Sequence, residues 1–138
     1  MYFIKPRVMD VSEGSMAEKK MKYDITCLAG HDSVFYTMSI TSKESALNDT
    51  AIITRSDGTR QSLKVEKLYI DPKGSGWVSR VRIYMTYEDY KRLYDAGTPF
   101  KISIGSNQSM LAFGFPMHKW EKEKQLMKKI IDIIELNK

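Results

Sequence analysis

The chain has 138 residues, of which 42% are hydrophobic and 28% are charged, and it contains 8 glycines and 4 prolines. This composition is typical of one globular domain and excludes a disordered or fibrous chain. The 22 lysines and arginines outnumber the 17 aspartates and glutamates, which gives a net charge of +5, and the single cysteine excludes an internal disulfide.

The first 20 residues are predicted to be an N-terminal arm and linker, ahead of a single β-rich domain over residues 21–138. Residues 2–11 alternate loosely and contain Pro6, which has no backbone N–H. Because proline is confined to sheet edges or strand ends, we expect an edge strand or an ordered arm here. Residues 12–20 lack apolar periodicity and are typical of a linker.

A period of two begins near residue 22 and indicates half-buried strands. Residues 22–27 and 34–40 are predicted to form a hairpin around a turn at residues 30–32. Cys27 shares the apolar face of its strand with Tyr23 and Ile25. A free cysteine in that position behaves as a small hydrophobic residue, so we expect it to be buried and unreactive.

A second hairpin is predicted from residues 50–55 and 61–70. The Asp57-Gly58 pair between them suits a tight turn, since both residues tolerate unusual backbone angles. The later strand carries two apolar pairs on opposite parities, Leu63 with Val65 and Leu68 with Ile70. A bulge near Glu66 and Lys67 would bring both pairs to one face.

The clearest alternation follows the break at residues 72–76 and covers residues 78–86. It predicts a half-buried antiparallel strand with an apolar and a polar face. Val81, Ile83 and Met85 are expected to point inward, and Arg80, Arg82 and Tyr84 outward.

A short helix is predicted from Tyr87 to about Ala96. Thr86 supplies a hydroxyl cap, Glu88 and Asp89 fall in the first turn, and Gly97 ends the helix. Its apolar stripe consists of Tyr90, Leu93 and Tyr94.

Two further strands, residues 99–104 and 110–115, are predicted to form a hairpin ahead of Pro116. From Met117 onward the apolar period becomes helical and predicts an amphipathic helix of about five turns. Its apolar face includes Trp120, Met127, Ile131 and Ile134, and its polar face Lys122, Lys128, Lys129, Asp132 and Glu135.

These elements predict an α+β fold. Six to eight mostly antiparallel strands would form a β-sandwich or a partly open barrel, with a short helix and a C-terminal amphipathic helix packed on the sheet. No run of residues approaches the roughly 18 uncharged apolar residues of a membrane-spanning helix.

Cofactor and metal sites are not expected. His31 and His118 are the only histidines, and neither lies in a spacing that binds zinc or supports general-base chemistry. The glycine-containing turn at residues 73–76 lacks the spacing of a phosphate-binding loop. No catalytic residue is therefore proposed from the sequence.

The basic residues are concentrated in one half of the chain. Residues 1–58 carry 7 basic and 8 acidic side chains, whereas residues 59–138 carry 15 and 9. Arg80, Arg82 and Tyr84, with Lys101 and Ser103 on a strand expected to lie nearby, could form a basic and aromatic sheet face. Such faces bind single-stranded nucleic acid by phosphate contact and base stacking.

The order of elements after Val81 is similar to that of small uncharacterised β-rich proteins from gut Bacteroidetes. The similar features are the strand, the short helix containing Leu-Tyr-Asp-Ala-Gly, the hairpin with FKISIG and MLAFGF, and the final helix. The resemblance implies a compact β-sandwich or barrel with helical cover, and it brings no activity with it.

The function predicted first is a non-enzymatic binding or accessory module that acts through a protein-protein surface. Single-stranded nucleic-acid binding through Arg80, Arg82, Tyr84 and Lys101 is the alternative, and an enzyme with a site assembled from distant residues is the third. A secretory signal has an uninterrupted apolar run near its start, whereas charged residues interrupt the start of this chain. We therefore expect a cytoplasmic protein, or a periplasmic or secreted one if a leader was removed.

Overall fold

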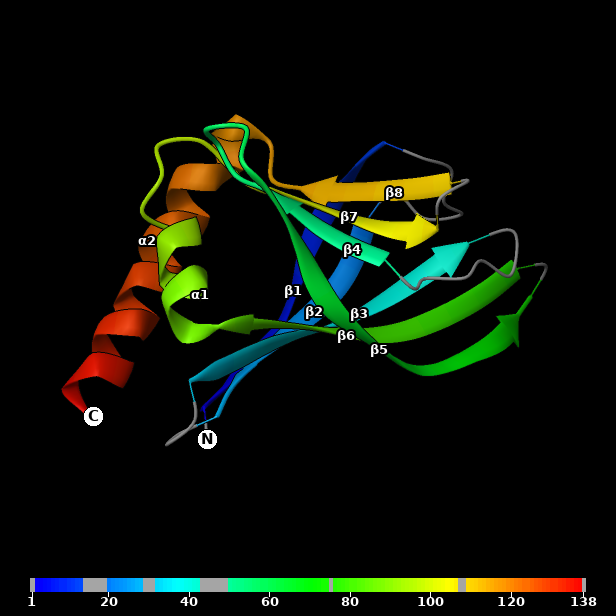
Figure 1. The fold of residues 1–138 in the computed structure, drawn as a ribbon, viewed down its shortest axis with the longest axis horizontal. Helices are drawn as coiled ribbons and strands as arrows, with labels where there is room; N and C mark the ends of the chain where they lie inside the picture. The colour runs from blue at the N-terminus through cyan, green and yellow to red at the C-terminus, as the bar shows by residue number, and fades with distance from the viewer. Residues whose placement is uncertain are drawn as a thin grey trace.

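The computed structural model describes residues 2–13, 20–28, 32–42, 50–74, 76–106 and 109–137. Eight strands and two helices make up these described residues (Figure 1). The strands are β1 (Tyr2–Glu13), β2 (Lys20–Cys27), β3 (Ser33–Ser42), β4 (Thr50–Thr54), β5 (Arg60–Lys73), β6 (Gly76–Thr86), β7 (Lys101–Ser106) and β8 (Ser109–Gly114). The helices are α1 (Tyr87–Leu93) and α2 (Met117–Leu136).

The strands form a closed barrel in the order β1-β2-β3-β6-β5-β4-β7-β8. Every neighbouring pair is antiparallel, and the pairing of β1 with β8 closes the barrel. The predicted α+β fold with a mostly antiparallel sheet and a C-terminal helix is therefore confirmed. Of the two architectures expected, the strands adopt the barrel.

The first strand belongs to the barrel; the sequence pattern predicts an edge strand or an ordered arm over residues 2–11 and a linker over residues 12–20. β1 pairs with β2 from Tyr2 to Asp10 and with β8 from Asp10 to Glu13. The register with β2 shifts between Ile4 and Arg7, the interval that contains Pro6. A residue without an N–H fits such an irregularity, because no ladder hydrogen bond is required of it. Residues 14–19 of the predicted linker lie outside the described residues.

The predicted irregularity in β5 is present but lies slightly later in the strand. The register with β6 shifts between Lys67 and Tyr69, rather than at Glu66 and Lys67. Leu63 and Val65 are partly buried and pack against the core. Of the second apolar pair, Leu68 is only partly buried and Ile70 is 43% exposed, so the end of β5 leaves the core and this pair is not buried as expected.

The turn between β4 and β5 forms as its sequence predicts. Gly58 adopts a φ of 89°, a left-handed conformation that disfavours side chains. Its N–H donates to the carbonyl of Arg55 at 2.9 Å, and the N–H of Thr59 donates to Oδ1 of Asp57 at 2.9 Å. These bonds hold the start of β5 against the end of β4.

The interior of the barrel is filled by alternating apolar side chains. On β6 the buried residues are Val81, Ile83 and Met85, as the alternation predicts. Tyr23 and Tyr36 stack in this interior with ring centroids 5.6 Å apart. The hydroxyl of Tyr36 lies 2.6 Å from that of Tyr94, and burial raises the pKa of both phenols well above the ordinary value, so both stay neutral.

Both helices cover the same end of the barrel (Figure 1). The predicted cap of α1 is present, since Oγ1 of Thr86 accepts a hydrogen bond from the N–H of Asp89 at 3.1 Å. α1 ends at Leu93, earlier than the predicted Ala96, but its expected apolar stripe is buried. α2 begins directly after Pro116 and covers the predicted range.

Trp120 of α2 closes this end of the barrel. Its ring lies 5.8 Å from the rings of Tyr94 and Phe100 and 5.9 Å from that of Phe115. Its Nε1–H donates to the carbonyl of Ala96 at 3.2 Å. The tryptophan therefore joins α2 to the segment between α1 and β7 and to the residue after β8.

One feature of α2 is absent from the sequence prediction. Glu123 lies on the buried face of the helix and is 6% exposed. The hydroxyl of Tyr23 donates to Oε1 of Glu123 at 3.3 Å. Charged residues are rarely buried without such partners, which explains how a carboxylate is accommodated within an apolar stripe.

We predict that deleting α2 by truncation after Pro116 abolishes cooperative unfolding, because it exposes the apolar end of the barrel. Trp120→Ala should lower the free energy of unfolding by about 3 to 5 kcal/mol, the range for a buried aromatic residue. Urea denaturation measures both effects. The control, Lys122→Ala on the exposed face, should change stability by less than about 0.5 kcal/mol. A truncated chain that melts like the full chain would show that α2 is detachable.

Candidate functional site

The outward residues of β6 lie where the sequence predicts, but neighbouring side chains engage them. Nη2 of Arg80 lies 3.2 Å from Oδ2 of Asp24 on β2. Its Nη1 donates to Oγ of Ser39 on β3 at 2.6 Å. Arg80 therefore holds three adjacent strands together on the outside of the barrel, and its charge is neutralised locally.

Arg82 and Tyr84 are engaged in the same way. The guanidinium of Arg82 lies over the ring of Phe35, 4.5 Å from its centroid. The hydroxyl of Tyr84 donates to Oε2 of Glu66 at 2.6 Å, and Nζ of Lys64 lies 5.4 Å from the centre of its ring. The cation and the ring that would contact a phosphate and a base are thus already covered by residues of the same sheet.

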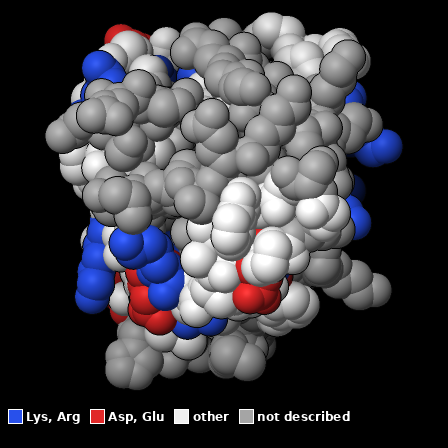
Figure 2. Space-filling view, turned by 90° about the vertical axis from the view of Figure 1, so that its right-hand side faces the viewer, with Lys and Arg blue, Asp and Glu red and all other residues white. Residues whose placement is uncertain are grey.

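Lys101 does not join this face. It begins β7, and both β5 and β4 lie between β6 and β7 around the barrel. The structure therefore brings Arg80, Arg82 and Tyr84 together but separates Lys101 from them. Figure 2 shows that, at the lower left of the end of the barrel opposite the helices, lysine and arginine side chains lie directly beside acidic ones.

A shallow hollow of about 280 Å³ lies beside Tyr84, between β5 and the start of α1. Tyr84, Lys64, Gln61 and Asp89 are among the residues that line it. Since Lys64 lies over the ring of Tyr84 and Gln61 donates to Asp89 at 3.2 Å, the polar groups of this hollow largely face one another.

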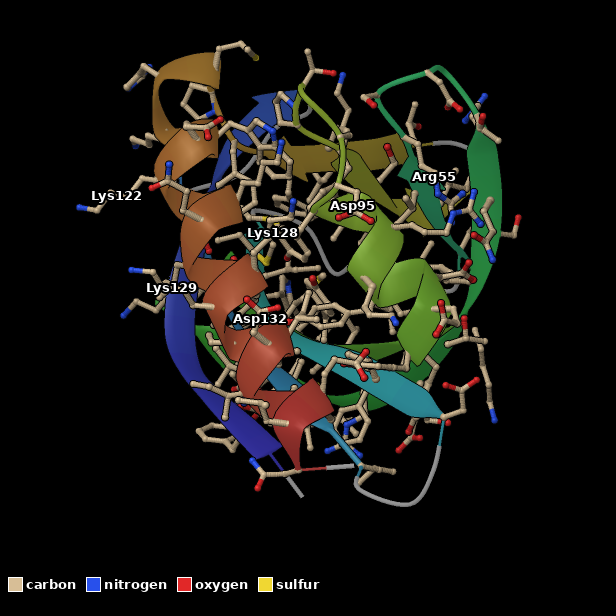
Figure 3. The ribbon with its side chains drawn as sticks, turned by 90° about the vertical axis from the view of Figure 1, so that its left-hand side faces the viewer. Arg55, Asp95, Lys122, Lys128, Lys129 and Asp132 are labelled. Atoms are coloured by element: carbon tan, nitrogen blue, oxygen red, sulfur yellow. The ribbon has the colours of Figure 1, made fainter. Side chains whose placement is uncertain are left out.

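The outer face of α2 carries lysines that are not engaged in this way. Lys122 and Lys129 are exposed, and neither forms an ion pair within the described part of the chain. Figure 3 shows both side chains projecting to one side of α2, away from α1. Lys128 differs, because its Nζ lies 3.6 Å from Oδ1 of Asp95 in the segment that follows α1.

A pocket of about 260 Å³ opens at the helix-covered end, between the β4–β5 turn and the segment that follows α1. Leu93 and Phe100, 2% and 3% exposed, contribute an apolar wall. The polar wall includes Arg55, Arg92 and Asp95, and Figure 3 shows Arg55 and Asp95 on neighbouring elements at this end. The volume is below the roughly 300 to 1,000 Å³ of sites for drug-sized ligands, so it suits a small group.

Arg55 is the most buried charge of this pocket, with 13% of its side chain exposed. Its Nη2 donates to Oε1 of Gln61 at 2.6 Å and lies 3.6 Å from Oδ1 of Asp89. Arg92 lies 3.6 Å from the same Asp89 oxygen. Nε of Arg55 is buried and has no hydrogen-bond partner within the described residues. Two guanidinium groups therefore share one carboxylate, and one of them keeps an unused donor.

The sequence pattern does not identify this pocket. Its lining comes from a hairpin turn, the end of a helix and a loop, which are up to about 45 residues apart in the chain. The one available signal is Arg55 itself, an arginine placed immediately after a buried strand and before a tight turn. That placement is common at hairpin ends and has no specificity for binding.

The histidines and the cysteine considered in the sequence for catalysis or metal binding do not form a site within the described residues. His118 is exposed in the first turn of α2, and His31 lies outside the described residues. Among the residues that the structure describes, no group of three or more His, Cys, Asp or Glu side chains is arranged to hold a metal ion. Cys27 is free and buried, and burial raises the pKa of its thiol to about 11.

Comparison of the chain with protein-family models, with curated proteins and with solved structures gives no significant match. The resemblance to β-rich proteins of gut Bacteroidetes therefore stays a prediction. Neither helix in the described ranges has the length and apolar character required to cross a membrane.

We predict that a thiol reagent labels Cys27 only after denaturation. The raised pKa leaves almost no thiolate at pH 7 to 8, and the side chain is 4% exposed. Labelling is followed by mass spectrometry, with the protein in denaturant as the positive control. Labelling of the native protein within minutes would contradict the assignment of Cys27 to the core.

Proposed function

We propose that the protein is a non-enzymatic binding module that acts through a protein-protein surface, and that the outer face of α2 binds an acidic segment of its partner. The observation that supports this proposal most is the state of Lys122 and Lys129, which are exposed and unpaired within the described residues. Charges of this kind steer oppositely charged partners and determine the register of docking.

The spacing of the two lysines defines the segment that would fit. They are seven residues apart on one helix, so their Cα atoms are separated by about 10 Å along the axis. Carboxylates at positions i and i+7 of a partner helix, or i and i+3 of an extended segment, have about the same separation. The uneven charge of the chain supports the same choice, since the basic excess lies in residues 59–138.

The alternative, single-stranded nucleic-acid binding, has less support. It requires Arg80, Arg82 and Tyr84 to exchange the contacts that they make within the sheet for contacts with phosphate and base. Each such exchange breaks an existing hydrogen bond or cation–π contact, which reduces the net gain. Lys101 would contact a different side of the barrel. An enzyme with a site assembled from distant residues stays the third alternative.

We predict that a 20-residue peptide with glutamate at every seventh position binds the protein more tightly than the same peptide with glutamine. Lys122→Gln with Lys129→Gln should weaken this binding by about threefold to tenfold, the value of two exposed ion pairs. Raising the salt concentration should weaken it further, because exposed charges are screened. Fluorescence anisotropy measures the dissociation constant.

Lys128→Gln is the matched control. Lys128 lies on the same helix and is 50% exposed, but it already faces Asp95, so its replacement should change the affinity by less than about twofold. Equal binding of the glutamate and glutamine peptides would contradict the proposal.

A single-stranded oligonucleotide tests the alternative in the same assay. We predict that the oligonucleotide does not bind near physiological salt, either to the protein or to the variant in which Arg80, Arg82 and Lys101 are replaced by alanine. Micromolar binding that this triple substitution abolishes, with the fold intact, would instead favour nucleic acid. The slope of log affinity against log salt would then be about −0.7 for each phosphate neutralised.

A further inference from the structure

A line of residues on the outer face of α2 combines the two exposed lysines with apolar side chains. A helix turns by about 100° per residue, so residues spaced alternately by four and by three positions fall on one side of it. On α2, five such residues lie within about 40° of one line. Together they are the α2 stripe, which consists of Lys122, Leu126, Lys129, Ile133 and Leu136.

The C-terminal end of the α2 stripe is an apolar surface that the barrel core does not use. Ile133 is 54% exposed and Leu136 is 85% exposed, whereas their neighbours Ile131 and Ile134 are buried beneath the helix. Leu126, one turn before Lys129, is half-buried. Burial of such a surface against another molecule is favourable in proportion to the apolar area removed from water.

The α2 stripe is positively charged, because the acidic residues of the helix lie elsewhere on its surface. The four acidic residues of α2 are Glu121, Glu123, Asp132 and Glu135. Each lies about 80° or more around the helix from the centre of the stripe. Glu135 forms an ion pair with Lys91 of α1 at 3.0 Å, and Glu123 is buried beside Tyr23.

The two lysines of the stripe keep their charge available to a partner. Neither Lys122 nor Lys129 forms an ion pair within the described ranges, and both project to the side of α2 that faces away from α1 (Figure 3). A partner complementary to the whole stripe therefore carries carboxylates opposite the lysines and apolar groups opposite Ile133 and Leu136.

The spacing of the stripe favours a helix as this partner. Alternating steps of three and four residues define the seam between two helices, in which each side chain fits among residues of the facing helix. In an extended segment, residues i and i+3 have a suitable separation but point to opposite faces. Such a segment cannot direct both of its carboxylates at the stripe.

A second copy of this chain does not fit the stripe. In a parallel pair of α2 helices, each lysine of the stripe would face the same lysine of the other copy. In an antiparallel pair centred on the stripe, Lys129 would face Lys129 of the other copy. Like charges placed opposite each other disfavour both arrangements, so the stripe suits a different, acidic molecule.

We propose that the α2 stripe binds an amphipathic helix of the partner, with acidic residues facing Lys122 and Lys129 and apolar residues facing the rest of the stripe. This inference rests on the proposed function, because it specifies the acidic segment that the outer face of α2 binds. It adds that the segment is helical and that burial of apolar side chains supplies part of the affinity.

The test uses 20-residue peptides and fluorescence anisotropy with the full chain. Glutamate at positions i and i+7, with leucine at i+4, i+11 and i+14, matches the stripe in the parallel direction, and the reversed spacing matches it in the antiparallel direction. Each peptide is compared with a version in which alanine replaces every leucine. The better leucine peptide should bind at least about tenfold more tightly than its alanine version, which keeps the charges and the helix propensity.

A proline peptide tests the helical form of the partner. Proline at a central position that points away from α2 breaks the peptide helix and leaves every glutamate and leucine in place. It should weaken binding at least about tenfold. Undiminished binding of the proline peptide would show that the segment is not helical and would overturn the proposal.

Two substitutions on α2 locate the apolar contact. Ile133→Gln with Leu136→Gln should weaken binding of the leucine peptide about tenfold and binding of the alanine version less than about twofold. Both residues are exposed, so the fold should stay intact. Met117→Gln is the matched control, because Met117 is 58% exposed on the same helix but lies outside the stripe, and it should leave the affinity unchanged.

The outcomes separate this inference from the proposed function. Tighter binding of glutamate than of glutamine peptides, together with equal binding of the leucine and alanine versions, supports the acidic partner and overturns this inference. Equal binding of glutamate and glutamine peptides overturns both.

Two other occupants of the stripe are tested by sedimentation. Dimerisation of the full chain that Ile133→Gln with Leu136→Gln abolishes would overturn the proposal in favour of a second copy. Sedimentation with phosphatidylserine vesicles that the same variant abolishes would overturn it in favour of a membrane surface. We expect the protein to be monomeric and to stay in the supernatant near physiological salt.

Discussion

The apolar interior of an eight-stranded barrel has to be covered at its ends, and at one end α1 and α2 cover it, with Trp120 as the largest of the fully buried side chains. Trp120 contacts Tyr94, Phe100 and Phe115, and its indole N–H is satisfied by the carbonyl of Ala96. Aromatic contacts of this geometry add to the gain from burial of the ring. The position of α2, of the loop before β7 and of the residue that follows β8 all depend on this contact.

The same contact shapes the pocket at the helix-covered end. Ala96 and Phe100 touch Trp120 on one side and line the pocket on the other. The apolar wall of the pocket is therefore the outer surface of the packed end of the barrel.

Charge on the surface of this protein falls into two kinds. On the sheet, Arg80 and Arg82 are held by Asp24 and by the ring of Phe35, so their charges contribute to strand association. On α2, Lys122 and Lys129 have no partner within the described residues and are available to another molecule. The net charge of +5 does not distinguish these kinds, because it counts every cation equally.

The sequence by itself determined the elements that depend on local chemistry. The alternation of β6, the Thr86 cap, the Asp57-Gly58 turn and the amphipathic stripe of α2 are each set by neighbouring residues, and each is confirmed. Only the tertiary structure decided that β1 joins the barrel and that Lys101 lies away from Arg80, because strand order depends on contacts between distant segments. The burial of Glu123 and the pocket around Arg55 were decided in the same way, since their partners come from other elements and no local pattern records them.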